Sequence, residues 1–119
     1  MAQKPRLEDL DNETILLTVV LRHDQSMDLE EQQARLGEAG WWEAFPPEGV
    51  EIVSWNVVMG IGQIATLRLP PRLLNHVNVA LERCAWGVFR TEVYPSYDFT
   101  KVRERLTSQW RAASAEDAQ

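Results

Sequence analysis

Four runs of β-branched and aliphatic residues, interrupted by two amphipathic patterns, constrain the fold more than any other feature of the chain. The strand-like runs are residues 14–23, 50–58, 63–69 and 86–99, and the helical patterns are residues 24–40, 70–84 and 100–111. The resulting order, β-α-β-β-α-β with a C-terminal helix, is that of the split βαβ or ferredoxin-like arrangement. We therefore expect an α+β protein with a four-stranded antiparallel sheet. The fourth strand should lie beside the first, the first beside the third and the third beside the second.

The chain length and the polar segments at both ends predict one domain. A chain of 119 residues suffices for a single core. Residues 1–12 are polar and lack a period, so they predict a flexible arm, and residues 13–111 form the predicted domain. Residues 112–119 predict a disordered polar tail. Gly40 is expected to end the first helix, because glycine readily adopts the left-handed conformation that follows many helices.

Composition excludes several classes of function. The net charge of −6 argues against a nucleic-acid partner, because phosphate binding depends on lysine and arginine. No apolar run approaches the roughly 18 residues of a membrane span, which predicts no membrane partner. A single cysteine, Cys84, fits a reducing compartment, so a cytoplasmic location is expected.

Alternation along the strands sorts their side chains onto two faces of the sheet. One set is almost wholly apolar and should pack under the helices: Leu17, Val19, Leu21, Val53, Trp55, Val57, Ala65, Leu67, Leu69, Phe89 and Val93. The other set is half apolar: Thr18, Val20, Arg22, Ile52, Ser54, Asn56, Val58, Ile64, Thr66, Arg68, Val88, Arg90, Glu92 and Tyr94. Such a face is too apolar to be left to water, which predicts a homodimer whose two sheets face each other.

The run V-E-I-V-S-W-N-V-V-M-G-I-G-Q-I-A-T-L-R-L-P, followed by a helix and F-R-T-E-V-Y, resembles the dimeric α/β barrel superfamily and is similar to its small GYD-type domains. The resemblance covers residues 14–97 and implies the ferredoxin-like fold and a dimer. The chain departs from the family at residues 60–63, where Gly-Ile-Gly-Gln replaces Gly-x-Tyr-Asp. The superfamily includes cofactor-free monooxygenases, isomerases and ligand-sensing domains, so the resemblance does not select one activity.

The half-polar face holds the candidate ligand-binding residues. Its charged members are three arginines and one glutamate, an excess of positive charge in an acidic chain. Two interpretations stay open: structural ion pairs within or across a dimer, or a site for a carboxylate or phenolate, which the planar guanidinium binds through paired hydrogen bonds. A flat aromatic ligand would also find polar contacts there. The candidate ligand-binding residues are Arg22, Asn56, Arg68, Arg90, Glu92 and Tyr94.

His23 is the candidate catalytic residue, because it ends the first strand directly before Asp24, whose carboxylate could orient the imidazole as a general base. The alternative is a surface histidine beside a capping aspartate. His76 is expected to be exposed, and no spacing of His23 and His76 supports a metal site or a cofactor. The sequence therefore predicts a protein that binds a small anionic or aromatic metabolite, either a cofactor-free isomerase or monooxygenase or, alternatively, a non-catalytic interaction module.

Overall fold

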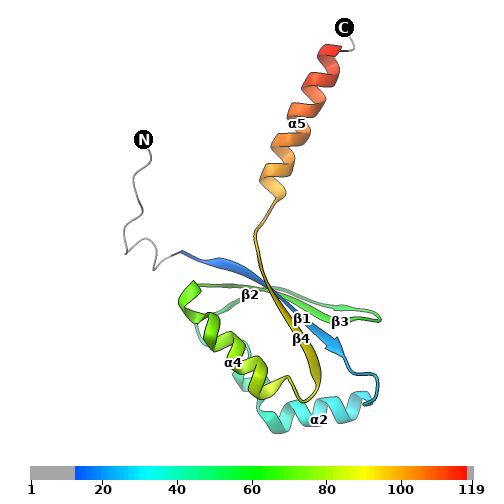
Figure 1. The fold of residues 1–119 in the computed structure, drawn as a ribbon, viewed down its shortest axis with the longest axis vertical. Coiled ribbons are helices and arrows are strands. Elements are labelled where there is room, and N and C mark those ends of the chain that lie inside the picture. The colour runs from blue at the N-terminus through cyan, green and yellow to red at the C-terminus, as the bar shows by residue number, and fades with distance from the viewer. Residues whose placement is uncertain (1–12, 118–119) are drawn as a thin grey trace.

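The computed structural model describes residues 13–117, and the predicted arm at residues 1–12 lies outside them. A four-stranded antiparallel sheet carries its helices on one side (Figure 1). The strands are β1 (Ile15–His23), β2 (Glu51–Val58), β3 (Gly62–Leu69) and β4 (Phe89–Ser96). The helices are α2 (Leu29–Ala39), α3 (Trp41–Ala44), the 3-10 turn η1 (Pro71–Leu73), α4 (Leu74–Cys84) and α5 (Thr100–Asp117).

The strand order β2-β3-β1-β4 confirms the predicted sheet. β1 lies between β3 and β4 and pairs antiparallel with both, Val19 standing opposite Ala65 on one side and Val93 on the other. These central residues are apolar because they face the helices. The α+β, ferredoxin-like arrangement is therefore confirmed.

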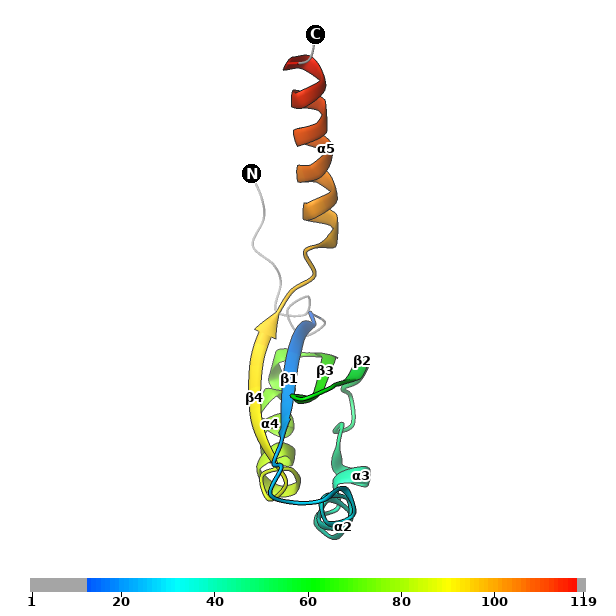
Figure 2. The ribbon, with the colours of Figure 1, turned by 90° about the vertical axis from the view of Figure 1, so that its right-hand side faces the viewer.

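The core lies between the sheet and the layer formed by α2, α3 and α4 (Figure 2). Leu17, Val19 and Leu21 from β1 alternate into it, as the period of two requires. An aromatic cluster joins the helix layer to β2: Trp41 stacks on Phe45 at 4.5 Å between ring centroids, and both meet the edge of Trp55. The indole Nε1 of Trp55 donates to Gln63 Oε1 at 2.7 Å, which satisfies its polar atom in a half-buried position.

A β-bulge in β2 corrects the predicted assignment of faces. The register shifts between Ile52 and Ser54, so Ile52 stands opposite Leu67 and belongs to the helix-facing side. The inserted residue is Val53, and it is 45 % exposed rather than buried. Val57, also predicted to be buried, is exposed because β2 is an edge strand that pairs only with β3. A single inserted residue reverses alternation, and it therefore reverses the predicted face of Ile52.

Val88 was also placed on the wrong side. It precedes β4, is buried, and joins the core cluster instead of the half-polar face. Neither Val88 nor Ile52 lies on the face opposite the helices. That face therefore has fewer apolar side chains than the sequence predicts.

α2 begins and ends where the sequence indicates. The Asp28 carboxylate caps it by accepting from the Glu31 N–H at 2.8 Å. Gly40 ends it in the left-handed conformation (φ 79°), which confirms the predicted stop. Its buried side chains are Gln32 and Leu36. The Gln32 amide lies inside because it donates to the carbonyls of Asp24 and Met27, a polar satisfaction that periodicity of apolar residues does not reveal.

α5 is longer than predicted and stands apart from the rest of the molecule. It continues to Asp117, so residues 112–117 are helical where the sequence predicted a disordered tail. The alanines at 112, 113 and 115 explain the continuation, because alanine has the highest helix propensity. The helix leaves the end of β4 and projects away from the sheet (Figures 1 and 2), and no residue of α5 is buried. Among residues 13–117, no helix has the length and apolarity that crossing a membrane demands.

Candidate functional site

The sheet face opposite the helices, called the outer face here, is organised in four rows of neighbouring side chains. The strand registers place together Glu51, Arg68, Leu16 and Ser96; then Ser54, Thr66, Thr18 and Tyr94; then Asn56, Ile64, Val20 and Glu92; then Val58, Gly62, Arg22 and Arg90. The candidate binding residues therefore share one face, as predicted from their parity. They do not share one place on it.

Arg68 lies far from the other two arginines. It pairs with Leu16 near the start of β1, whereas Arg22, six residues further along β1, pairs with Arg90. Six residues of extended chain span about 20 Å. Arg68 also has its own partner, donating from Nη1 to Glu51 Oε2 at 3.2 Å. Asn56 lies on β2, two strands away from Val20 on β1 and three strands away from Glu92 on β4. The structure thus separates Arg68 and Asn56 from the other candidates.

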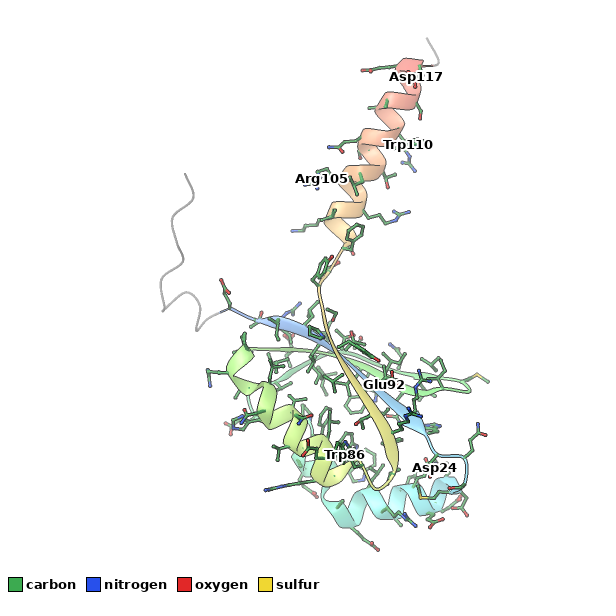
Figure 3. All side chains as sticks on the ribbon, viewed as in Figure 1. Asp24, Trp86, Glu92, Arg105, Trp110 and Asp117 are labelled. Carbon is green, nitrogen blue, oxygen red and sulfur yellow. The ribbon has the colours of Figure 1, made fainter. Side chains whose placement is uncertain are left out.

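Arg22, Glu92 and Tyr94 form one connected network (Figure 3 labels Glu92). Arg22 Nε donates to Glu92 Oε1, and the Tyr94 hydroxyl donates to Glu92 Oε2 at 2.8 Å. The hydrogen bond from Arg22 lowers the pKa of Glu92, with the bond from Tyr94 as the second cause. In turn, Glu92 raises the pKa of Arg22 and of Tyr94. Glu92 is thus held as a carboxylate, and its two oxygens are already occupied.

Arg90 differs from the other two arginines on the outer face. Within residues 13–117 no carboxylate lies within ion-pair distance of its guanidinium, although Arg22 and Arg68 each have one. Its side chain is exposed and stands beside Arg22 across the β1–β4 pair. Because Arg22 is already paired with Glu92, Arg90 is the arginine of this pair whose charge has no carboxylate partner among residues 13–117.

A groove of about 510 Å³ runs along this rim of the sheet. It is lined by Arg22, His23 and Asp24 at the end of β1, and by Trp86, Gly87, Val88, Phe89 and Arg90 at the start of β4. The α4–β4 connection forms one wall, since Trp86 follows α4 directly. We call this hollow the rim groove. Its size lies within the range of small-molecule sites.

Trp86 is the lining residue that the sequence reasoning did not select. It is 60 % exposed, and its indole Nε1 donates to Thr91 Oγ1 at 3.0 Å, which holds the ring beside β4 (Figure 3). Its position between a helix end and a strand start was the available signal, because such connections carry exposed residues.

His23 lies in the rim groove without the carboxylate partner that sequence reasoning considered. Its ring stacks on Phe89, with centroids 5.8 Å apart, on the helix-facing side of the sheet. The Asp24 carboxylate turns away and accepts from the Ser26 N–H at 2.9 Å and from the Ser26 hydroxyl at 2.6 Å, which lowers the pKa of Asp24. No hydrogen bond joins Asp24 to the His23 ring. Asp24 thus closes the turn before α2, which agrees with the alternative of a surface histidine beside a structural aspartate, and a catalytic role for His23 stays a prediction.

The second histidine behaves as expected. His76 is exposed on α4, where it borders a shallow hollow of about 300 Å³ beside α3. Across residues 13–117, no group of three metal-ligating side chains is placed to hold an ion.

The fold and this rim define a ferredoxin-like α+β protein with a groove at one end of its sheet, lined by Arg22, Arg90 and Asp24 among others. No family model matches the chain, no curated protein matches its sequence, and no solved structure matches its fold. The similarity to the dimeric α/β barrel superfamily thus stays a prediction from residues 14–97.

The Arg22–Glu92–Tyr94 network predicts a loss of stability in acid. The pKa of Glu92 is lower in the folded protein than in the unfolded chain, so the folded state gains stability above the ordinary glutamate pKa of about 4.3. That gain disappears as the pH falls through the folded pKa. In Glu92→Gln, the free energy of unfolding should change less between pH 6 and pH 3 than in the unmodified protein. Urea titrations at both pH values measure it, and an unchanged pH dependence would contradict the network's role.

Proposed function

We propose that the protein binds a small, flat anion, an aromatic carboxylate or phenolate, in the rim groove. The observation that carries the proposal is Arg90, whose guanidinium has no carboxylate partner among residues 13–117 and which lines a hollow bordered by the exposed ring of Trp86. Arginine binds a carboxylate through two parallel hydrogen bonds, and an indole ring packs well against an aromatic ligand. The groove thus offers one contact for each end of such a molecule.

Binding is better supported than catalysis. A cofactor-free isomerase or monooxygenase would use His23 as the base, and His23 does border the groove. Its ring, however, has no bond to Asp24, and efficient general bases have their imidazole orientation fixed by a hydrogen bond. The proposal therefore assigns His23 a place in the wall of the groove. The alternative, a non-catalytic interaction module, is supported by the closed Arg22–Glu92–Tyr94 network, which is of the kind that structural ion pairs form.

Replacing Arg90 with methionine should weaken binding of an aromatic carboxylate by about 1.5–3 kcal/mol, the range for a hydrogen bond to a charged group. Calorimetric titration measures this loss, with a panel of benzoates and their neutral amides and of phenolates and their neutral methyl ethers. The amides should bind the unmodified protein as weakly as the acids bind Arg90→Met.

Arg68→Met is the matched control. Arg68 also lies on the outer face, but on β3 beside the start of β1, whereas Arg90 lies beside the end of β1. Arg68→Met should leave the affinity unchanged. Equal losses in the two variants would show that binding responds only to net charge. If no acid binds the unmodified protein, the interaction module becomes the better description of the rim.

We further propose that the protein is a homodimer in which the outer faces of two copies pack together. Support comes from aliphatic side chains on a face that none of the described helices covers: Val20 and Ile64 are neighbours at its middle, and Leu16 lies near the start of β1. Val20 is buried, and Ile64 and Leu16 are half-buried. An interface of standard size buries roughly 1,600 Å² in total. A second copy in this position would border the rim groove on the side of Arg22 and Arg90.

Ile64→Glu should therefore dissociate the dimer, because it places a charge at the centre of the proposed interface. Sedimentation velocity at micromolar concentration measures the change in mass. Val57→Glu is the control: it introduces the same charge from a β-branched residue on the neighbouring strand, but on the other side of the sheet and at an exposed position. A monomeric unmodified protein would contradict the proposal.

A further inference from the structure

α5 presents an apolar patch that nothing in residues 13–117 covers. Leu106, Trp110 and Ala113 follow the helical period along one side, and with Thr107 and Gln109 they line a shallow hollow in the middle of the helix. Leu106 is 47 % exposed and Trp110 75 %. An 18-residue helix with no buried residue lacks the tertiary packing that stabilises most protein helices. Figure 3 shows Trp110 on the helix far from the sheet.

The charges within α5 run against its own dipole, and the favourable acid at its N-terminal end is Asp98 just before the helix, which accepts from the Thr100 N–H at 2.8 Å. The first turn has no acidic residue and the last turn has no basic one. Arg103 and Arg105 flank the N-terminal side of the patch, and Glu116 and Asp117 flank its C-terminal side. The positive end of a helix dipole is its N-terminus, so both pairs are unfavourable in an isolated helix. The arrangement becomes favourable when a second helix lies alongside in the opposite direction.

We propose that α5 pairs antiparallel with α5 of a second copy of this chain. A two-fold axis near Gln109 brings the patch of each helix onto the patch of the other. The same axis places Arg103 and Arg105 of one copy beside Glu116 and Asp117 of its partner at both ends of the pair. The two helix dipoles then point in opposite directions. The charges that are unfavourable at each end of an isolated α5 lie beside opposite charges of the partner helix.

The occupant is a second α5 because the pattern is self-complementary. A two-fold contact requires one surface to fit itself, and a patch at the helix centre with opposite charges at its two ends meets that requirement. A parallel pair would instead set Arg103 and Arg105 against their own counterparts, and likewise Glu116 and Asp117. This interface lies on a different element from the outer face, so it is separate from the dimer proposed above and from the rim groove.

Variants of the full chain that each carry one added cysteine test the pairing with a short bismaleimide crosslinker. The native Cys84 is buried and does not compete. Gln109→Cys should crosslink to itself because it lies near the axis. Val102→Cys and Glu116→Cys should each stay monomeric on a denaturing gel when alone, and they should crosslink to each other when mixed. Ser108→Cys, on the opposite side of the helix by the 3.6-residue period, is the control that should not react with itself.

Charge reversal supplies a second readout. Arg103→Glu with Arg105→Glu should reduce the Gln109→Cys crosslink at least tenfold. Adding Glu116→Lys and Asp117→Lys to the same chain should restore it. Self-crosslinking of Val102→Cys alone would indicate a parallel pair and overturn the proposal, as would a Gln109→Cys yield no greater than that of Ser108→Cys. Because none of these positions borders the rim groove, titration of aromatic carboxylates distinguishes failure of the pairing from failure of the proposed function.

Discussion

Gly62→Ala should lower the free energy of unfolding by on the order of 3–5 kcal/mol, combining backbone strain and steric overlap. Gly62 opens β3 with φ +144°, a conformation that residues with a Cβ rarely adopt. A Cβ built there would lie 2.0 Å from the carbonyl oxygen of Leu21 and 3.0 Å from the amide nitrogen of His23. Both contacts are backbone atoms of β1, so the strands themselves would have to separate.

Gly37→Ala is the matched control for this prediction. Gly37 lies in α2, and a Cβ at that position meets no atom within 4 Å. Alanine should therefore stabilise the helix by roughly 0.5–1 kcal/mol. Urea unfolding followed by circular dichroism gives both values. If Gly62→Ala unfolded at the same urea concentration as the unmodified protein, the close approach of β1 to residue 62 would be refuted.

The close approach of β1 to Gly62 also matters for the rim groove. Gly62 pairs with Arg22, and the His23 N–H donates to the carbonyl of Ile61 at 3.0 Å. The same hairpin end thus fixes the last residues of β1, which form one side of the groove. We expect Gly62→Ala to weaken ligand binding as well, although residue 62 does not line the groove.

Strand order was predictable because each strand carries its own evidence. A period of two marks the faces of β1 and β3, and the order of elements then selects the ferredoxin-like arrangement. Leu17, Leu67 and Ala65 all lie in the core as predicted. These assignments depend only on local alternation and on connection rules, both of which a single sequence contains.

Register and irregularity were not predictable in the same way. Parity placed Arg22, Arg68 and Arg90 on one face, but their separation along the strands depends on which residues of β1 and β3 stand opposite each other. The bulge at Val53 has no glycine or proline to announce it, so it reversed the predicted face of Ile52. An error in register moves a side chain along the strand direction, and an unpredicted bulge moves it to the other face of the sheet.

The prediction of the candidate site depended on strand order, which was correct, and on register, which was not. Arg22, His23 and Arg90 meet at the rim because strand neighbours were predicted well, whereas Arg68 does not join them because register was not. Trp86 was not selected as a candidate, because the sequence does not show whether a tryptophan between a helix and a strand is buried or exposed. The C-terminal helix shows a further limit: its alanines predict helix, but an apolar stripe does not say whether its partner belongs to the same chain.

Leu67→Ala should lower the free energy of unfolding by about 2–5 kcal/mol, because it removes a fully buried side chain and leaves a cavity between β3 and the helix layer. Ile52→Ala is its matched control. Ile52 stands directly opposite Leu67 on the same side of the sheet, yet it is 43 % exposed at the edge strand. Its loss should cost about 1 kcal/mol, since part of its surface is already in water. Urea unfolding measures both changes. Equal losses would mean that the helix layer covers β2 as fully as β3, and a stable Leu67→Ala would mean that the helices pack on the opposite face.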